Sequence, residues 1–300
     1  MAISEAAVGR GAMVTGRGLS PAAAAWRRLV ASPAARAGLV MAVAFVLIAL
    51  VTPAVHVYDA RTDADLTLRL KPPTAAHPFG TDSLGRDILV RVLHATRVSL
   101  GLAVSAVAVA TVIGSALGFL AGYFRRQVDL VVMFCMDIVL AFPATLLAIA
   151  IVAMIGPGLR NSLFAISLVS IPAYARLSRG AVLALREQEF VLAAQGLGCS
   201  GQRVLLGHIV PNSLPPLIVQ TTLSIAFAIL EAAALGFLGL GAQPPTPEWG
   251  AMLADSYKYF TSGAWWVFCF PGVAIMLSVL GFNLLGDGLR DALDPRLGRG

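Results

Sequence analysis

The sequence predicts an all-α, polytopic membrane protein with six transmembrane helices. Of its 300 residues, 58% are hydrophobic and only 13% are charged, whereas an average soluble domain is about 25% charged. Several uncharged runs exceed the roughly 18 residues that indicate a membrane helix. The clearest of them cover residues 37–58, 98–124 and 138–159. So little charge cannot supply a water-facing surface for a chain of this length.

The expected spans follow from these runs and from the polar segments between them. Pro172 interrupts the fourth span, and Arg176 and Arg179 follow it. A proline is tolerated in a membrane helix when neighbouring helices satisfy the freed carbonyl, and Pro143 is expected to kink the third span. The six spans are expected at about 37–58, 98–123, 130–155, 161–178, 214–240 and 266–286.

Four regions are expected along the chain. The first apolar run is longer than the 7–15 residues of a signal-peptide core, so we expect it to remain as the first span. The Ala-, Gly- and Arg-rich tail before it is expected to be largely disordered. The regions are a cytoplasmic tail (1–36), the first helix with an outer loop (37–97), the transmembrane core (98–290) and a second cytoplasmic tail (291–300).

The basic residues predict the orientation in the membrane. If the six spans alternate across the membrane, most of the 22 Lys and Arg residues lie on the same side of the membrane as the N-terminus. The exceptions concentrate in the loop 59–97. Because basic residues favour the cytoplasmic side, both termini and the polar segment 179–213 are expected in the cytoplasm. The net charge of +6 comes from dispersed arginines that flank spans, so no nucleic-acid partner is expected.

Several classes of protein find no support in the sequence. It has no GxxxxGK[ST] motif, so it does not hydrolyse ATP through a phosphate-binding loop of its own. The three cysteines fit no metal spacing, and every histidine lies at or beyond the end of a span, so no intramembrane catalytic set is visible. A secondary transporter would carry inverted repeats, and none is apparent.

The segment 189–212 is polar and lies between strongly apolar segments, which predicts a helical hairpin outside the bilayer. Acidic residues in the first turn suit a helix dipole, two alanines remove bulk from the surface, and glycines allow a positive φ. Ser200 can cap a second short helix over 201–207, and Pro211 is expected to end the hairpin. An inert loop explains the spacing equally well. The candidate contact residues are Glu189, Ala193, Ala194, Gly198, Arg203, His208, Pro211 and Asn212.

Two carboxylates interrupt the apolar spans. Placing one at the centre of a bilayer costs about 2.5–3.5 kcal/mol, so Asp137 and Glu231 are expected to face a helix bundle or a water-filled path. Phe142 and Pro143 follow Asp137 at the expected kink. The two acids can line a translocation path, or they can form a hydrogen bond or an ion pair between spans. Both readings remain open.

The outer loop contains a glycine- and aspartate-rich turn that leads into a surface helix. Asp82, Arg86 and Asp87 belong to this turn. Trp249, near two further tryptophans, is expected in the aromatic belt at the membrane surface.

Four segments together resemble the permeases of dipeptide, oligopeptide and nickel ABC importers, specifically the C-type subunit. One departure is Leu192, which stands where the family often has a glutamate before the paired alanines. The segments are HPFGTDSLGRDILVRVLHATRVSL (77–100), DIVLAFPATLLA (137–148), the hairpin 189–212, and ILEAAALGFLGLGAQPPTPEWGAML, resuming as PGVAIMLSVLGFNLLGDGLRDALDP (229–253 and 271–295).

This resemblance implies a type I ABC importer fold in a bacterial inner membrane. The implied partners are a B-type permease, two cytoplasmic ATPases, an extracytoplasmic solute-binding protein and membrane lipid. The hairpin would couple to an ATPase, and Asp82, Arg86, Asp87 and Trp249 would face the binding protein. The chain itself would bind no cofactor, since ATP and Mg²⁺ belong to the ATPases. Peptides are the implied cargo, with nickel chelates or another small solute as the alternative.

Overall fold

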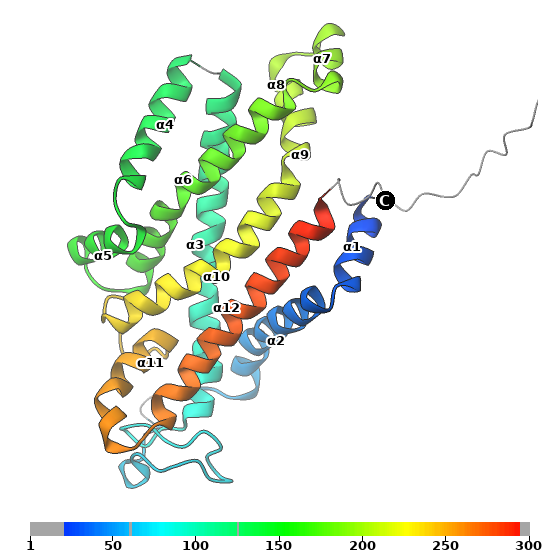
Figure 1. The fold of residues 1–300 in the computed structure, drawn as a ribbon. Coiled ribbons are helices and arrows are strands. Elements are labelled where there is room, and N and C mark those ends of the chain that lie inside the picture. Colours follow the sequence, from blue (N-terminus) through cyan, green and yellow to red (C-terminus); the bar gives the residue numbers. More distant parts are fainter. Residues whose placement is uncertain (1–20, 60–61, 125, 295–300) are drawn as a thin grey trace, which may run out of the picture.

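The protein is a bundle of helices, seen here in a computed structural model that describes residues 21–59, 62–124 and 126–294 (Figure 1). The helices are α1 (Pro21–Ala31), α2 (Pro33–Val55), α3 (Ile88–Phe124), α4 (Arg126–Leu140), α5 (Ala144–Ile155), α6 (Leu159–Leu185), α7 (Glu189–Gly196), α8 (Gly201–Val204), α9 (Val210–Asn212), α10 (Leu214–Phe237), α11 (Trp249–Ser256) and α12 (Trp266–Leu293).

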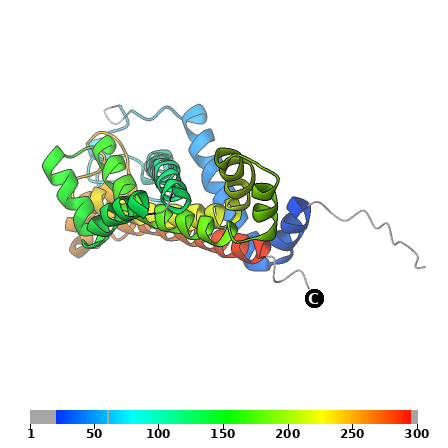
Figure 2. The ribbon, with the colours of Figure 1, turned by 90° about the horizontal axis from the view of Figure 1, so that it is seen from above.

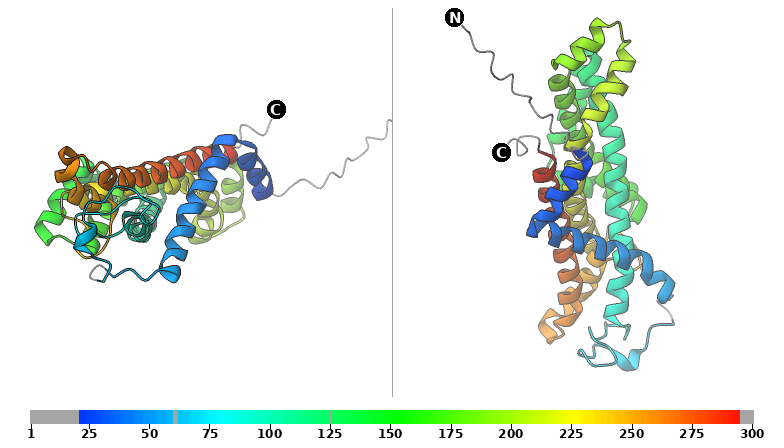
Figure 3. Two further views of the ribbon diagram at one scale, coloured as in Figure 1. Left: turned by 90° about the horizontal axis from the view of Figure 1, so that it is seen from below. Right: turned by 90° about the vertical axis from the view of Figure 1, so that its right-hand side faces the viewer.

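The bundle has two distinct ends. Helices α7 and α8 protrude at one end, which we call the hairpin end, and the segment between α2 and α3 folds at the other, which we call the loop end (Figure 1). The loop end also holds α11, whose Trp249 ring donates a hydrogen bond to the carbonyl oxygen of Val92 on α3 (3.2 Å). Figure 3 shows the same separation from a perpendicular direction.

Most of the expected spans are confirmed as long apolar helices. Within the described ranges, α2, α3, α10 and α12 are long and apolar enough to cross a membrane, and α4 with α5 makes a fifth candidate only as a bent pair. Helix α6 carries the fourth expected span as one continuous helix through Pro172, but it is not among the helices apolar enough to count as candidate spans. The count of six spans therefore stays a prediction that four helices and one bent pair support.

The third expected span, 130–155, is not one helix. Helix α4 ends at Leu140, α5 begins at Ala144, and their axes differ by 87°. Pro143 stands at the N-terminal boundary of α5, where its missing N–H costs nothing because the first N–H groups of a helix have no partner within it. The position of the expected kink is confirmed. The chain does not bend within one helix there, however, but turns sharply between two separate helices.

Helix α6 packs along α3 through a row of glycines. A Cβ atom at Gly118 would lie 2.2 Å from the carbonyl oxygen of Ala175 on α6, and one at Gly114 would lie 2.6 Å from that of Ile171. Gly122, four residues further on, would meet Val182. Glycines at this spacing let two membrane helices approach closely. The α3–α6 pair is therefore the central contact of the bundle.

We expect Gly118→Ala to destabilise the protein by about 1–3 kcal/mol, because the added methyl overpacks a backbone contact. Gly101→Ala is the matched control on the same helix, since its Cβ would meet nothing within 4 Å. Thermal unfolding of the purified variants in detergent measures both. Equal melting temperatures for the two variants would contradict this expectation, since they would show that α6 accommodates a methyl group at position 118 without loss of stability.

The N-terminal region is more ordered than the sequence suggests. Residues 21–31 form α1 and α2 begins at Pro33, so the expectation of disorder was wrong for the described part of the tail, and residues 1–20 lie outside it. Leu29 of α1 packs with Ala35 and with Ala292 of α12. Figure 2 shows α2 at the edge of the bundle, far from α5. Helix α2 nevertheless joins the fold closely, because a Cβ at Gly38 would lie 2.5 Å from the backbone nitrogen of Leu285.

Candidate functional site

The hairpin that joins α6 to α10 is almost entirely helical. Helix α7 begins three residues after α6, and Gly198, at φ +80°, turns the chain toward α8. A π-helical turn over Leu205–Ile209 and then α9 lead into α10. The expected helix–turn–helix is confirmed, but Pro211 does not end it, because the helical run continues. Ser200 precedes α8 without a side-chain capping bond.

A small apolar core holds the hairpin together. Val191 and Ala194 of α7 pack with Val204 and Ile209, and Val182 of α6 completes the cluster. Ala194 was expected on the surface, but it is buried, because its face of α7 turns toward the second arm. Ala193 is exposed. Ala194 therefore stabilises the hairpin. A bulky replacement there would disturb the folding of the hairpin as well as any docking, so it does not test docking alone.

The outer face of the hairpin is unusually apolar for a polar segment. Leu197 is 86% exposed, Leu206 67% and Leu192 51%. Phe190 is also exposed. Exposed large apolar side chains on a protruding element are candidates for contact with a partner. Leu192 was noted only as a departure from the family pattern, and Leu197 and Leu206 were not among the expected contact residues.

Most of the remaining candidate residues of the hairpin are also exposed. Glu189, Arg203 and Pro211 are exposed. The amide of Asn212 donates a hydrogen bond to the carbonyl oxygen of His208 (2.6 Å). The hairpin thus exposes both apolar and polar side chains, a mixture typical of protein interfaces.

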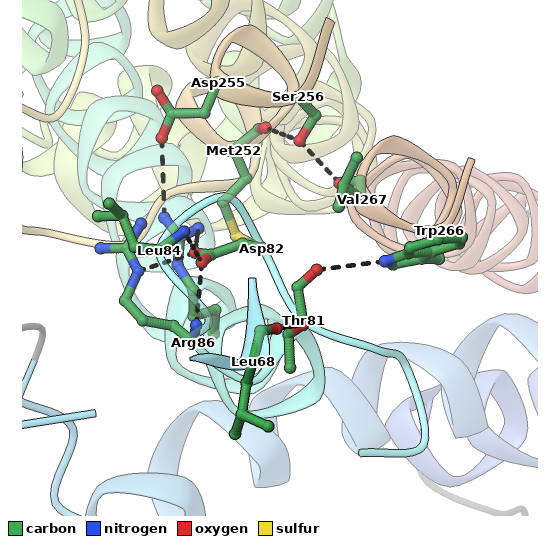
Figure 4. Close-up of polar contacts among 11 residues, drawn as sticks. Leu68, Thr81, Asp82, Leu84, Arg86, Met252, Asp255, Ser256, Trp266 and Val267 are labelled. Atoms are coloured by element: carbon green, nitrogen blue, oxygen red, sulfur yellow. Dashed lines mark hydrogen bonds and ion pairs between the residues drawn. The ribbon is translucent and has the colours of Figure 1, made fainter. Parts of the chain in front are cut away.

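The turn at the loop end is a buried ion cluster. The Asp82 carboxylate lies 2.8 Å from Nε of Arg86 and 2.5 Å from Nη1 of Arg91. The backbone N–H groups of Leu84 and Arg86 also donate to it. Figure 4 shows this carboxylate at the centre of its partners, with Asp255 of α11 at the rim, 3.9 Å from Arg91.

Two of the residues expected to face a binding protein are instead buried in this cluster. Asp82 is 5% exposed and Arg86 7%, so both serve the fold of the loop. Asp87 pairs with the His77 ring (2.8 Å), and its carboxylate also accepts from the N–H of Val90 at the start of α3. The turn was recognised in the sequence, but its burial was not.

Trp249 is also not at the surface. It is fully buried and lies 5.9 Å from the Phe45 ring, edge to face. The expectation of a place in the aromatic belt was wrong, because α11 packs inward against α3 and α10. At the same end, the Trp266 ring donates to the carbonyl oxygen of Thr81 (3.2 Å; Figure 4).

Glu248, the residue immediately before α11, was not among the expected site residues. Its carboxylate accepts hydrogen bonds from the N–H groups of Gly250 and Ala251 (both 2.9 Å) and from the Ser99 hydroxyl (3.0 Å). Burial raises the pKa of this carboxyl above its usual value, and these hydrogen bonds act in the opposite direction. Glu248 therefore fixes α11 to α3 and caps its first turn.

The intramembrane acids have different surroundings. Asp137 accepts a hydrogen bond from Nη2 of Arg176 on α6 (2.6 Å), and more than half of each side chain is exposed. Two turns away, both oxygens of Asp129 accept from Arg179 (2.5 and 2.7 Å). Two ion pairs thus connect α4 to α6, which favours the structural reading of Asp137.

Glu231 is buried at 7% exposure. Its Oε1 accepts from the Thr145 hydroxyl on α5 (2.7 Å), whereas its Oε2 is buried without a hydrogen-bond partner among the described residues. Such an orphaned oxygen is rare in folded proteins. Phe142 and Pro143 lie at the nearby break between α4 and α5, with Phe142 56% exposed. The bend and Glu231 therefore belong to one region, whereas Asp137 belongs to the α4–α6 contact.

Exchanging the charges of Asp137 and Arg176 distinguishes a role of Asp137 in helix packing from a role in contact with cargo. We expect Asp137→Arg to destabilise the α4–α6 contact by about 0.5–2 kcal/mol, since it places like charges together, and Asp137→Arg with Arg176→Asp to recover the loss. Thermal unfolding and solute uptake in vesicles would be measured in parallel. A double variant that regains stability but not uptake would show that Asp137 acts on cargo.

The fold and the hairpin define a multi-pass membrane protein with an interaction element at one end. Over residues 114–299 the chain matches the family of the binding-protein-dependent transport system inner membrane component, and over residues 20–73 the N-terminal TM domain of oligopeptide transport permease C. The chain belongs to this family of binding-protein-dependent transport permeases, and the resemblance predicted from its four segments is confirmed.

Relatives match along almost the whole chain. The dipeptide transport system permease protein DppC of Alkalihalophilus pseudofirmus is 49% identical over 93% of this chain and 91% of its own length. The probable D,D-dipeptide transport system permease protein DdpC of Escherichia coli is 46% identical over 90% of each. A glutathione transport system permease protein, GsiD of Pectobacterium atrosepticum, is 43% identical over 91% of this chain and 90% of its own.

The fold is also found in a solved structure. A chain of the MetNI methionine ABC transporter, in an inward-facing conformation, superposes with a TM-score of 0.56 at 18% identity, covering 69% of this chain and 98% of that one. The all-α, type I importer fold class is confirmed by this likeness and by the family.

Proposed function

We propose that this chain is the C-type permease subunit of a peptide importer and that the hairpin 189–212 docks on a separate ATPase. The observation that carries the proposal is the exposed apolar face of Leu192, Leu197 and Leu206 on a hairpin with its own core. Large exposed apolar side chains on a protruding element are typical of a protein interaction site. The peptide cargo is supported by relatives whose names specify dipeptides.

The same proposal gives the molecule its orientation. The hairpin end is cytoplasmic, together with both termini, and the loop end faces the outside of a bacterial inner membrane. The arginines of the N-terminal region support this orientation, since residues 21–58 contain Arg27, Arg28 and Arg36 but no Asp or Glu. The partners are a B-type permease, two ATPases and an extracytoplasmic solute-binding protein.

The chain performs no covalent chemistry in this proposal and binds no nucleotide or metal. ATP binding closes the two ATPases and moves the hairpin, and α6 and α10 carry that displacement into the membrane. Glu231, with one unpaired oxygen, is the candidate path residue beside the α4–α5 bend. Asp137, held by Arg176, positions α4.

Co-purification and transport test the proposal together. The complete complex, tagged on this chain, would be extracted from native membranes and reconstituted in lipid vesicles with its binding protein. We expect to recover a second permease and ATPase subunits, and to observe ATP-dependent uptake of a labelled dipeptide. Recovery of the folded chain without ATPase subunits would contradict the docking role. Full assembly with uptake of a different solute would contradict only the peptide cargo.

A further inference from the structure

The C-terminal end of α3 packs against the hairpin. Phe119 and Tyr123, one turn apart on α3, both contact the apolar core of the hairpin. Phe119 also packs against the main core of the bundle, so it belongs to both clusters. Along the chain the hairpin is joined only to α6 and α10. Its contact with α3 is therefore a third connection between the hairpin and the bundle, made by side chains alone.

The closest part of this connection joins Tyr123 to Gly201, the first residue of α8. A Cβ atom at Gly201 would collide with the hydroxyl oxygen of Tyr123 and would lie 3.1 Å from its Cζ. Both residues are partly buried. A glycine lets a neighbouring group approach the backbone this closely. The tyrosine ring therefore rests directly on the backbone of the hairpin, and only a glycine at position 201 leaves room for it.

Helix α3 is suited to carry a displacement over a long distance. It is the longest helix among the described residues, with 37 residues, or about 55 Å at 1.5 Å per residue. It contains no proline, whereas α6 and α12 each contain one inside the helix, and sharp kinks usually occur at proline. Figures 1 and 3 show α3 running from the hairpin end to the loop end.

At the loop end, α3 is fixed to the segments around it. Its first turns provide an arginine to the buried ion cluster around Asp82. The carbonyl oxygen of Val92 accepts a hydrogen bond from the Trp249 ring, and the Ser99 hydroxyl donates one to Glu248. A movement of α3 along or about its axis would therefore displace the outer loop and α11 with it.

We propose that Tyr123 connects the hairpin to α3 and that α3 carries the displacement of the hairpin to the loop end. This inference rests on the proposed docking of the hairpin on an ATPase. Packed side chains and rigid helices carry coupling between distant sites. Because such coupling is reciprocal, α3 also transmits the engagement of a solute-binding protein at the loop end back to the ATPases. Tyr123 is a positioning residue, since it acts through α3 and the hairpin.

The stimulation of ATP hydrolysis by the binding protein tests this role. The complete complex would be reconstituted in lipid vesicles, and the recovery of ATPase subunits, the basal and stimulated ATPase activities and the uptake of a labelled dipeptide would be measured. We expect Tyr123→Ala to retain the ATPase subunits and the basal activity, and to lower the stimulation and the uptake at least about fivefold, the lower end of typical coupling between two sites. Tyr123→Phe retains the ring and should behave as the wild type does.

A second pair of variants tests the contact itself. Gly201→Ala should reduce the stimulation as Tyr123→Ala does, because the added methyl group pushes the tyrosine ring away. Gly201→Ala with Tyr123→Phe should recover most of it, since without the hydroxyl the nearest ring atom lies 3.1 Å from the methyl group. Gly180→Ala on α6 is the matched control, because its Cβ would meet nothing within 4 Å.

Three outcomes would overturn the inference while the proposed function stands. Unchanged stimulation in Tyr123→Ala would show that α3 does not carry the displacement. Absence of recovery in the Gly201→Ala and Tyr123→Phe variant would show that position 201 acts through something other than Tyr123. Loss of the ATPase subunits from Tyr123→Ala would show that Tyr123 only maintains the shape of the hairpin for docking. Failure of the wild-type chain to recover ATPase subunits would instead contradict the proposed docking, and this inference with it.

Discussion

Leu197→Asp with Leu206→Asp is expected to abolish recovery of the ATPase subunits and ATP-driven uptake, while leaving the permease folded. Both side chains are more than 60% exposed, so their replacement removes no internal packing. A carboxylate in the centre of an apolar interface is desolvated without a counter-charge, and hot-spot residues of this kind contribute 2 kcal/mol or more each. Co-purification and ATPase activity in lipid measure the effect.

Leu66→Asp provides the matched control for this variant. Leu66 is 69% exposed at the loop end, so the same chemical change occurs at similar exposure on the opposite side of the molecule. We expect it to retain the ATPase subunits. Retention of those subunits by the Leu197 and Leu206 variant as well would place the docking surface elsewhere.

The leucines are a better test than Gly198→Asp. Gly198 adopts a φ of +80°, where a residue with a Cβ is strained by about 1–2 kcal/mol. A loss of coupling in that variant would therefore mix backbone strain with surface disruption. The open space around Gly198 means that strain alone can explain the result.

Asp82→Ala is expected to prevent accumulation of folded protein or to lower its stability by about 3–5 kcal/mol. The substitution leaves the buried guanidinium group of Arg86 without its counter-charge and Arg91 with only Asp255 at 3.9 Å. Stranding a buried charge in this way costs more than the intact pair contributes. Expression level and thermal unfolding of the purified protein provide the measurements.

Two further variants make this expectation specific. Asp65→Ala removes an exposed aspartate of the same loop that caps the short helix Leu66–Leu68 through Thr67, and we expect a loss of about 0.5–2 kcal/mol, smaller than that of Asp82→Ala. Asp82→Ala combined with Arg86→Met and Arg91→Met removes the stranded charges and should recover part of the loss. An unchanged melting temperature in Asp82→Ala would show that water reaches the cluster and screens it.

The sequence predicted the elements that depend on local composition. Long uncharged runs located α2, α3, α10 and α12, and the polar segment after α6 located the hairpin. Pro143 located the bend but not its angle, because a proline permits a turn and the packing of α5 against α6 determines its size. The α3 glycines at 114, 118 and 122 were visible at a four-residue spacing and went unnoticed.

What could not be predicted depends on contacts between distant segments. Asp82 and Trp249 were expected at the surface because an aspartate in a turn and a tryptophan near a span end usually lie there. Both are buried, because the loop before α3 and the helix α11 fold onto the same end of α3. Ala194 was misplaced for the same reason, since only the second arm of the hairpin determines which face of α7 is inside.

The continuity of the chain from α8 into α10 has a mechanical consequence. From Gly201 to Phe237 the backbone is helical except for a turn at Ser213, a length of about 55 Å at 1.5 Å per residue. A nearly continuous helix of this length changes its length very little. A force on its hairpin end therefore rotates the whole element about its contacts with α3 and α12. The π-helical turn at Leu205–Ile209 and the turn at Ser213 are the places where this run can bend. The stiffness of the helical run at these places would determine how much of a displacement of the hairpin reaches Glu231.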